Sequence, residues 1–415
     1  MTKPDRKLDD RAIGEVLGRV RGRVAASVRT HQSALHEIPE TAFEECATAA
    51  YLTGALEALG IAPRTGVAGT GLFAELPGAG VGPTVMVRAD MDGLPIDEDP
   101  SNVPRSRHDG RMHACGHDGH MAIVLGLAES LARSAEATLP GRVLLLFQPA
   151  EEDAKGGASG AQRIVESGLL DEQGVDAVLG LHLWSYLPLG QAILPDRLVM
   201  ASSDEVSLVF SGDGGHAALP HEAQDVVLAA SRTVDALQSI VARDVDPVCP
   251  AVVSIGTFHA GRAANVLPAE ARLTGTLRAA DRPARELLSR RVTEIAQGIA
   301  AAHGVTVDVE ISRGYPATIN DPRAAATVRE AARAVLGEGA VHDGPPSMGA
   351  EDFAYYLERR PGAFLLLGMR DEASGAVHPH HSPRFRIAPQ ALPLGVEILL
   401  RGALALMRET PLIAR

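Results

Sequence analysis

The chain of 415 residues is too long for one ordinary hydrophobic core, so its length predicts two compact domains. Its composition is 46% hydrophobic and 22% charged, which is typical of a globular protein and not of a disordered one. The formal net charge of -13 argues against nucleic-acid binding, because neutralising phosphates needs a concentrated basic surface.

The number of cysteines and the lengths of the apolar runs indicate the cellular compartment in which we expect the protein. The three cysteines lie far apart and leave one unpaired in any disulfide scheme, which favours a reducing compartment. The N-terminal region has no continuous apolar run for a signal peptide. No uncharged apolar stretch reaches the roughly 18 residues that a membrane span needs. We therefore expect a cytoplasmic protein that does not bind membranes.

The first part of the chain predicts helices that alternate with strands. Helices are expected over 46–59 and 121–132, the second largely buried. The expected strands are apolar runs over 71–76, 84–88, 142–147 and 177–182. The Gly/Pro-rich segment 77–83 predicts a hairpin-like connection between the first two strands. This alternation indicates an α/β fold with parallel strands.

From about Leu194 the pattern predicts a different, smaller unit. Its expected elements are strands over 205–210, 252–257 and 270–278 and helices over 223–242 and 283–303. The larger unit resumes near Tyr315 with a helix over 324–336, a strand over 362–367 and a closing helix over 392–408. We predict a discontinuous catalytic domain, 1–192 and 313–415, and an inserted α+β domain with an antiparallel sheet, 193–312.

Residues with metal-binding or acid-base side chains gather in five clusters after predicted strands, where open α/β sheets place their sites. The clusters span 88–92, 113–120, 148–152, 180–184 and 378–383. Their recurrence at strand ends favours one shared reaction centre.

A metal centre is the chemistry that these clusters favour. Cys115 and His117, separated by one glycine, supply a thiolate and an imidazole from one tight loop, a donor pair suited to Zn, Mn, Co or Ni. Four residues of other clusters could complete a two-metal centre: Glu151, Glu152, His182 and His381.

Each of these residues also has an ordinary structural interpretation. Alone, Cys115 would be a small buried thiol, and His182 would be a core histidine with satisfied hydrogen bonds. The adjacent pair Glu151 and Glu152 would be a solvated face. The metal hypothesis is favoured because all of these separate explanations would otherwise have to hold together.

Nucleophilic catalysis is the main alternative at this stage. Cys115 has His113 and His117 as candidate bases, but a cysteine nucleophile needs neither a Glu-Glu pair nor distant histidines. A serine nucleophile has less support, because the sequence contains no G-x-S-x-G elbow.

Seven short motifs between His36 and Gly395 point to a known family. They are His36-Glu-Ile-Pro-Glu40, Arg88-Ala-Asp-Met-Asp-Gly-Leu-Pro95, Met112-His-Ala-Cys-Gly-His-Asp118, Phe147-Gln-Pro-Ala-Glu-Glu152, Gly215-His-Ala-Ala-Leu-Pro-His221, Asn265-Val-Leu-Pro268 and Gly349-Ala-Glu-Asp-Phe353. Together they resemble the aminoacylase and carboxypeptidase G superfamily of di-metal hydrolases, in the branch of hippurate hydrolase and indole-acetyl-amino-acid hydrolases. The resemblance implies an α/β, aminopeptidase-like catalytic domain with a mixed sheet between helices.

The resemblance also implies roles for individual residues. The implied metal ligands are Cys115, His117, Glu152, His182 and His381, and the implied cofactor is a pair of divalent ions, Mn, Zn, Co or Ni. Glu151 would be the general base, and Asp92 would orient a metal ligand. In the peptidase branches a histidine stands near the position of Asp90 and an aspartate bridges the metals, whereas the cysteine-containing segment replaces that arrangement here.

For the inserted domain, the resemblance implies a lid that also forms a homodimer. His216 would reach the partner subunit's active site and stabilise the oxyanion, as the neighbouring glycines favour close approach to a ligand. Asn265 and Arg278 are candidates for binding the substrate carboxylate. Glu351 and Asp352 match a family motif and are expected to cap the following helix.

The function expected from the resemblance is hydrolysis of the amide bond of N-acyl amino acids, hippurate-like or related conjugates, by a metal-activated water. A dipeptidase or an N-carbamoyl-amino-acid hydrolase is the alternative enzyme. A catalytically silent homologue that binds small molecules is the alternative from another class. The presence of every implied ligand and of the base argues against a silent homologue.

Overall fold

The structure is a computed structural model that describes residues 14, 16–18, 20–78, 80, 82–132, 139–152 and 157–413, without the side chains of 21 and 410–413. The chain divides into two compact units. Unit 1 comprises Met1–Val199, Ile319–Pro345 and Tyr355–Arg415, and unit 2 comprises Met200–Thr318 and Pro346–Ala354. The first part of unit 2, Met200–Thr318, begins and ends later in the chain than the inserted domain that we predicted over 193–312. Its second part, Pro346–Ala354, lies in a segment that we had assigned to the larger domain.

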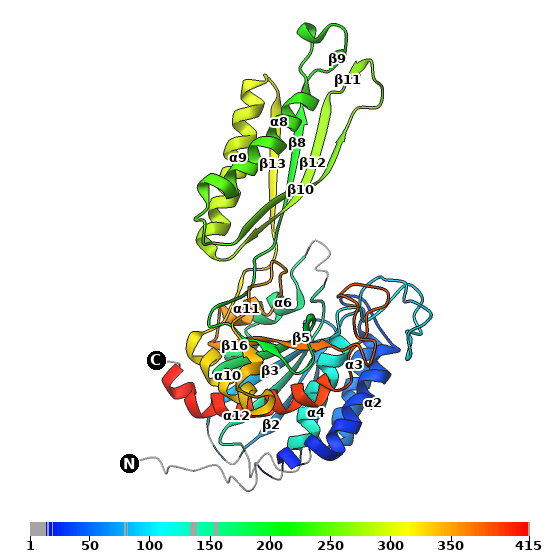
Figure 1. Ribbon diagram of the computed structural model, residues 1–415, viewed down its shortest axis with the longest axis vertical. Helices are drawn as coiled ribbons and strands as arrows, with labels where there is room; N and C mark the ends of the chain where they lie inside the picture. The colour runs from blue at the N-terminus through cyan, green and yellow to red at the C-terminus, as the bar shows by residue number, and fades with distance from the viewer. Residues whose placement is uncertain are drawn as a thin grey trace. The chain divides into compact units, whose positions relative to one another are not determined.

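An eight-stranded mixed sheet forms the centre of unit 1 (Figure 1). In spatial order its strands are β1 (Arg64–Val67), β2 (Gly71–Pro77), β4 (Arg142–Gln148), β3 (Thr84–Asp90), β5 (Ala177–Pro188), β16 (Gly362–Arg370), β6 (Ala192–Ile193) and β15 (Val341–His342). The central strands β4, β3, β5 and β16 are parallel. Strand β3 is buried along its whole length, as expected for an apolar strand covered on both faces.

Two details of this sheet differ from the sequence prediction. Strands β2 and β3 do not form a hairpin, because β4 lies between them, antiparallel to β2 and parallel to β3. The connecting segment 77–83 includes residues 79 and 81, which lie outside the described residues. Strand β5 extends to Pro188, so that His182 lies inside the strand and not beyond its end.

Helices α4 (His117–Leu131) and α12 (Ala391–Ile413) pack against β3 and β5. Nearly every residue of α4 is buried, which suits a helix that is apolar on all sides. Helix α2 (Ala25–His36), which the sequence analysis did not predict, packs closely on α4. A Cβ at Gly126 of α4 would lie only 2.5 Å from the Val28 side chain, so glycine permits this approach.

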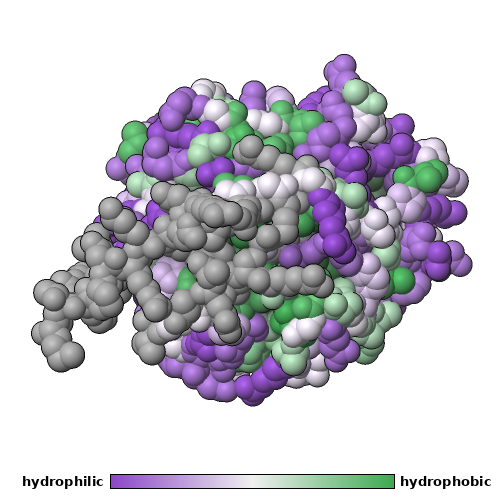
Figure 2. Space-filling model, turned by 90° about the horizontal axis from the view of Figure 1, so that it is seen from below, coloured by the Kyte–Doolittle hydropathy of each residue, from purple (hydrophilic) through white to green (hydrophobic). Residues whose placement is uncertain are grey.

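Unit 1 contains further helices besides α2, α4 and α12. They are η1 (Val20–Val24), α3 (Cys46–Ala58), α6 (Gly160–Glu166), α7 (Leu169–Glu172), α10 (Pro322–Leu336), η4 (Glu338–Ala340) and α11 (Ala354–Leu357), which begins at the last residue of unit 2. Within the described ranges, no helix is both long enough and apolar enough to cross a membrane. Outside the grey atoms, the face seen in Figure 2 carries hydrophilic side chains with hydrophobic ones interspersed among them.

Unit 2 is built on a four-stranded antiparallel sheet with helices α8 (Val226–Ser239) and α9 (Arg282–Ala302) packed against it. The strand order is β10 (Ala251–Ala260), β12 (Glu270–Ala279), β8 (Asp204–Ser211) and β13 (Thr306–Arg313). The shorter elements are β9 (Gly215–His216), β11 (Val266–Leu267), η2 (Pro220–Glu222) and η3 (Ile240–Asp244), and the linker strands are β7 (Leu198–Met200) and β14 (Thr318–Ile319). The sequence analysis missed β13, although apolar and polar residues alternate along it.

The two helices of unit 2 follow from their sequence patterns. The buried residues of α9 recur at every fourth position: Ala284, Leu288, Val292, Ala296 and Ala300. This spacing places them on one face of the helix, which covers the sheet. The carboxylates of Asp281 and Asp225 accept backbone N–H groups at the starts of α9 and α8, which fixes where these helices begin.

A buried carboxylate ties together three elements of unit 2. Asp204 on β8 is 1% exposed, and it accepts hydrogen bonds from Arg285 of α9, from Arg313 of β13 and from the backbone N–H of Gly314. We expect Asp204→Ala to lower the free energy of unfolding by about 3 kcal/mol, because it leaves the largely buried Arg285 guanidinium without its counter-charge. Thermal and urea unfolding would measure the loss. The exposed Asp308 on β13 provides the control, and an Asp308→Ala variant as unstable as Asp204→Ala would contradict this explanation.

Candidate metal centre

The ends of parallel strands bring three of the sequence clusters to one level in unit 1. Asp90 at the end of β3 pairs with Gln148 at the end of β4. Arg88 lies opposite Gly180 of β5, so the next residues on the same face, Asp90 and His182, also lie level with each other. This edge of the sheet is where open α/β sheets place their ligands.

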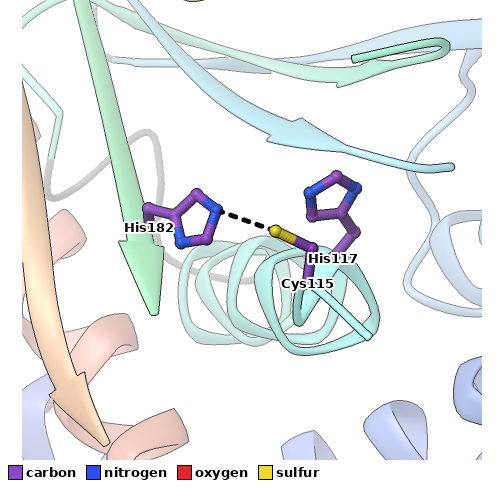
Figure 3. Close-up of side chains that lie close together, drawn as sticks. All are labelled: Cys115, His117 and His182. Atoms are coloured by element: carbon purple, nitrogen blue, oxygen red, sulfur yellow. Dashed lines mark hydrogen bonds between the residues drawn. The ribbon is translucent and has the colours of Figure 1, made fainter. Parts of the chain in front are cut away.

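A tight loop before α4 presents Cys115 and His117 to this edge. Gly116 between them has a φ of 91°, in the left-handed region that favours glycine, and α4 begins at His117. His182 points from β5 toward the loop, with its Nε2 3.5 Å from the Cys115 Sγ (Figure 3). A loop and a strand that are far apart in sequence thus place a thiol and two imidazoles together.

The candidate ligands form two groups that share one cysteine. The ligand atoms of Cys115, His117 and His182 lie within 4.8 Å of one another, and so do those of Cys115, Glu152 and His381. The structure therefore brings together all five residues that the resemblance implied as ligands. A shared thiolate between two groups is a suitable arrangement for a pair of cations.

Hydrogen bonds fix which ring nitrogen each histidine offers. His182 Nδ1 lies 2.7 Å from the carbonyl oxygen of Leu183, and His117 Nδ1 lies 2.9 Å from that of Asp92. Because a carbonyl only accepts, both Nδ1 atoms donate, and in the neutral ring that binds a metal each Nε2 keeps a lone pair. Among the described residues, His117 Nε2 is buried without a hydrogen-bond partner, and Glu152 Oε1 lies 3.2 Å from His381 Nε2.

The electrostatics around the candidate ligands suit a cation. Burial lowers the pKa of His117, but Asp90 and Asp92 outweigh it and raise that pKa to about 10. Burial and the Glu152 carboxylate raise the pKa of the Cys115 thiol. The contributions of the neighbouring carboxylates to both shifts reflect a negative potential, which a divalent cation would neutralise. The mixed thiolate, imidazole and carboxylate donors fit Zn, Mn, Co or Ni.

His120 and Asp90 lie beside this centre but are engaged elsewhere. His120 Nε2 accepts the N–H of Leu183 at 2.9 Å, and its Nδ1 donates to Asp90 Oδ1 at 2.7 Å. The Arg88 guanidinium donates to the other Asp90 oxygen at 2.8 Å. Since the one lone pair of His120 is already used, this histidine orients Asp90 and β5 and offers no donor to a metal.

The segment that carries the proposed base is held by Asp92. Its Oδ1 accepts the backbone N–H of Glu151 at 3.0 Å, and its Oδ2 accepts that of Glu152 at 2.8 Å. The Glu151 side chain is 6% exposed. One of its carboxylate oxygens lies within 4.8 Å of the candidate ligand atoms of His117 and Glu152. One carboxylate thus holds the backbone of both the predicted base and a candidate ligand.

The chain matches known proteins along most of its length. A model of Peptidase family M20/M25/M40 matches residues 86–405. The chain belongs to this family. IAA-amino acid hydrolase ILR1-like 2 of Arabidopsis thaliana is 38% identical over 90% of this chain and 84% of its own length. N-acetyl-L-cysteine deacetylase of Bacillus subtilis (strain 168) is 38% identical over 88% of this chain and 84% of its own length.

A solved structure confirms the fold of this M20 family member. A dinuclear metal binding peptidase of the M20 family from Bacillus subtilis has a TM-score of 0.81 at 32% identity, covering 93% of this chain and 99% of that chain. The α/β fold and the superfamily implied by the seven motifs are thereby confirmed. The family and these relatives support metal-dependent amide hydrolysis.

Unit 2 of the M20 chain holds the other three predicted site residues. His216 on β9 and Asn265 are exposed neighbours, since β9 pairs with β11 and the N–H of Ala217 donates to the Asn265 carbonyl at 3.1 Å. Strand β12 begins at Glu270, shortly after β11 and Asn265 in the chain. Arg278 lies eight residues farther along β12, roughly 26 Å from Glu270 at the usual strand rise. The structure therefore brings His216 and Asn265 together and places Arg278 near the opposite end of the sheet.

Two residues near the centre were missed by the sequence analysis. The His380 ring contacts Trp184 in a tilted arrangement and His182 edge-on, with ring centroids 5.0 and 5.2 Å away, and its Nε2 accepts the N–H of Ser185. The sequence analysis included it in the cluster 378–383 but gave it no role. Glu45 contacts the backbone before Glu151 from a distant part of the chain, and no local pattern marked it.

Proposed function

We propose that this M20 family member hydrolyses the amide bond of N-acyl amino acids, with Glu151 as the general base. The convergence of five donor side chains, two of which, His117 and Glu152, also group with the Glu151 carboxylate, is the observation that carries the proposal. The names of two relatives, an IAA-amino acid hydrolase and an N-acetyl-L-cysteine deacetylase, support the substrate class. Both names describe an amide between an acyl group and an amino acid.

We propose two divalent cations as the cofactor, with the shared Cys115 as a ligand of both. One group adds His117 and His182, and the other adds Glu152 and His381. Bound there, the cations would polarise a water molecule and the amide carbonyl. The dinuclear metal binding relative supports a pair of ions.

Glu151 would then carry the proton during the reaction. Its carboxylate lies beside the candidate ligand atoms, so it can accept a proton from the attacking water and deliver it to the leaving amine. Asp92 would keep Glu151 and Glu152 in place through their backbone N–H groups. Asp92 is thus a positioning residue in this scheme.

For unit 2 we propose the lid and dimerisation role that the resemblance implies. His216 Nδ1 accepts the N–H of Ala218 at 3.0 Å, so the neutral ring carries its proton on Nε2, as an oxyanion donor requires. The exposed Asn265 beside it is a candidate for binding the substrate carboxylate. Arg278 is the second candidate for binding the substrate carboxylate, but it lies near the opposite end of the sheet, where its Nε donates to the Thr276 hydroxyl at 3.0 Å.

A hydrolysis panel tests the proposed function. Metal-loaded enzyme should hydrolyse N-acetyl and N-benzoyl amino acids, a chelator should abolish turnover, and Mn, Zn, Co or Ni should restore it. His216→Ala should lower kcat/KM with no loss of metal. Faster turnover of dipeptides or N-carbamoyl amino acids would favour the alternative enzymes, and binding without turnover of any of these compounds would favour a silent homologue.

A further inference from the structure

A buried carboxylate outside the proposed metal centre holds the segment that leads to Glu151. The Glu45 side chain is completely buried, just before α3. Its Oε1 accepts the backbone N–H of Ala150 at 2.9 Å, and its Oε2 accepts the Thr70 hydroxyl at 2.5 Å. Glu45 therefore links α3, the turn before β2 and the end of β4.

The backbone at this contact has an unfavourable conformation. Ala150 has a φ of 52°, in the left-handed region that residues with a Cβ rarely adopt. Such a conformation persists where its surroundings fix it. Ala150 immediately precedes Glu151, so its conformation sets the direction in which the chain enters the proposed centre.

Three successive backbone N–H groups of this segment donate to two buried carboxylates. Ala150 donates to Glu45, and the next two residues, Glu151 and Glu152, donate to Asp92. The two carboxylates come from different elements, one before α3 and one after β3. Removing either carboxylate would leave a buried N–H without its acceptor and release one side of the segment.

The Glu45 contact does not depend on its charge. Burial raises the pKa of Glu45 to about 7. The protonated form still has a carbonyl oxygen that can accept from Ala150, and its hydroxyl can donate to Thr70. A glutamine at this position offers the same carbonyl acceptor and an N–H donor.

We propose that Glu45 is a positioning residue for the proposed general base and for the ligand Glu152, because it fixes the backbone at Ala150. The inference rests on the proposed function of the centre. It assigns Glu45 no contact with substrate or metal. The loss of Glu45 should act through misplacement of the two glutamates that follow Ala150.

The test compares Glu45→Ala with Glu45→Gln. The alanine variant should lower kcat about 10- to 100-fold with little change in KM, and it should weaken Zn²⁺ binding to the metal-free protein about tenfold. The glutamine variant should keep both quantities within about threefold of wild type, since it keeps the acceptor for Ala150.

A nearby buried glutamate provides the matched control. Glu40 accepts the backbone N–H groups of Ala47 and Thr48, also at the start of α3, but no N–H of the Ala150 segment. Glu40→Ala should therefore cost stability without changing kcat or Zn²⁺ affinity. Equal losses of kcat in the two alanine variants, or no rescue by Glu45→Gln, would overturn the proposal.

A shorter carboxylate tests the same contact if the alanine variant is unstable. If Glu45→Ala does not fold, Glu45→Asp keeps the charge but withdraws the acceptor by one methylene, and wild-type kcat and Zn²⁺ affinity in that variant would overturn the proposal. If the wild type hydrolyses no N-acyl amino acid, the proposed function fails. In that case, Zn²⁺ affinities of the wild type and the Glu45 variants, measured by calorimetric titration, still decide whether Glu45 positions Glu152.

Discussion

Glu151→Gln is expected to lower kcat by between about 10²- and 10⁴-fold while the metal stays bound. Glutamine has the shape of glutamate but cannot take a proton from water. The backbone N–H of Glu151 would still donate to Asp92, so the segment should keep its conformation. The five candidate ligands are unchanged in this variant, which is why metal content should not fall.

Steady-state kinetics and elemental analysis together measure this prediction. The same substitution at Glu166, an exposed residue of α6, is the matched control and should leave both quantities unchanged. Turnover of Glu151→Gln within about threefold of wild type would remove Glu151 as the base, given the usual size of general-base effects. Loss of metal together with turnover would show that Glu151 is a ligand and not the base.

Cys115→Ala is expected to remove most of both bound cations and, with them, the activity. Cys115 is the one donor common to the two ligand groups, so its loss affects both. His182→Ala and His381→Ala each remove a donor from one group only. Each histidine variant should therefore lose about one metal ion per chain, whereas the cysteine variant should lose both.

Elemental analysis after extensive buffer exchange would compare these stoichiometries. Cys249→Ala is the control for removing a thiol, because Cys249 lies in unit 2 and belongs to neither ligand group. Full metal content in Cys115→Ala with loss of activity would contradict the ligand role and favour a cysteine nucleophile. Equal loss of metal in all three ligand variants would contradict a shared thiolate.

The environment of Cys115 also bears on the cysteine nucleophile. Reactive cysteines have a lowered thiol pKa, usually next to a cation or a helix N-terminus. Here burial and the neighbouring glutamates raise the pKa of the Cys115 thiol. Without a metal, this thiol would remain protonated and a weak nucleophile, whereas a bound cation favours the thiolate.

The sequence by itself determined the elements whose pattern is local. The sequence analysis predicted a helix over 283–303, within one residue of the observed ends of α9, and the four-residue spacing of its buried residues and the Asp281 cap show how local that pattern is. The apolar runs predicted β3 and β4, and the side chains that follow them include Asp92 and Glu151. These features depend on a few neighbouring residues, so no knowledge of the fold was needed.

Only the tertiary structure decided which distant residues meet. The order of β2, β4 and β3 depends on strand pairing, which a short connection does not specify. The role of His120 follows from the N–H of Leu183, which occupies its lone pair. The contact of Glu45 with Ala150 joins segments 105 residues apart. Hydrogen bonds between distant segments leave no periodicity or spacing in the sequence, so these contacts could not be predicted from it.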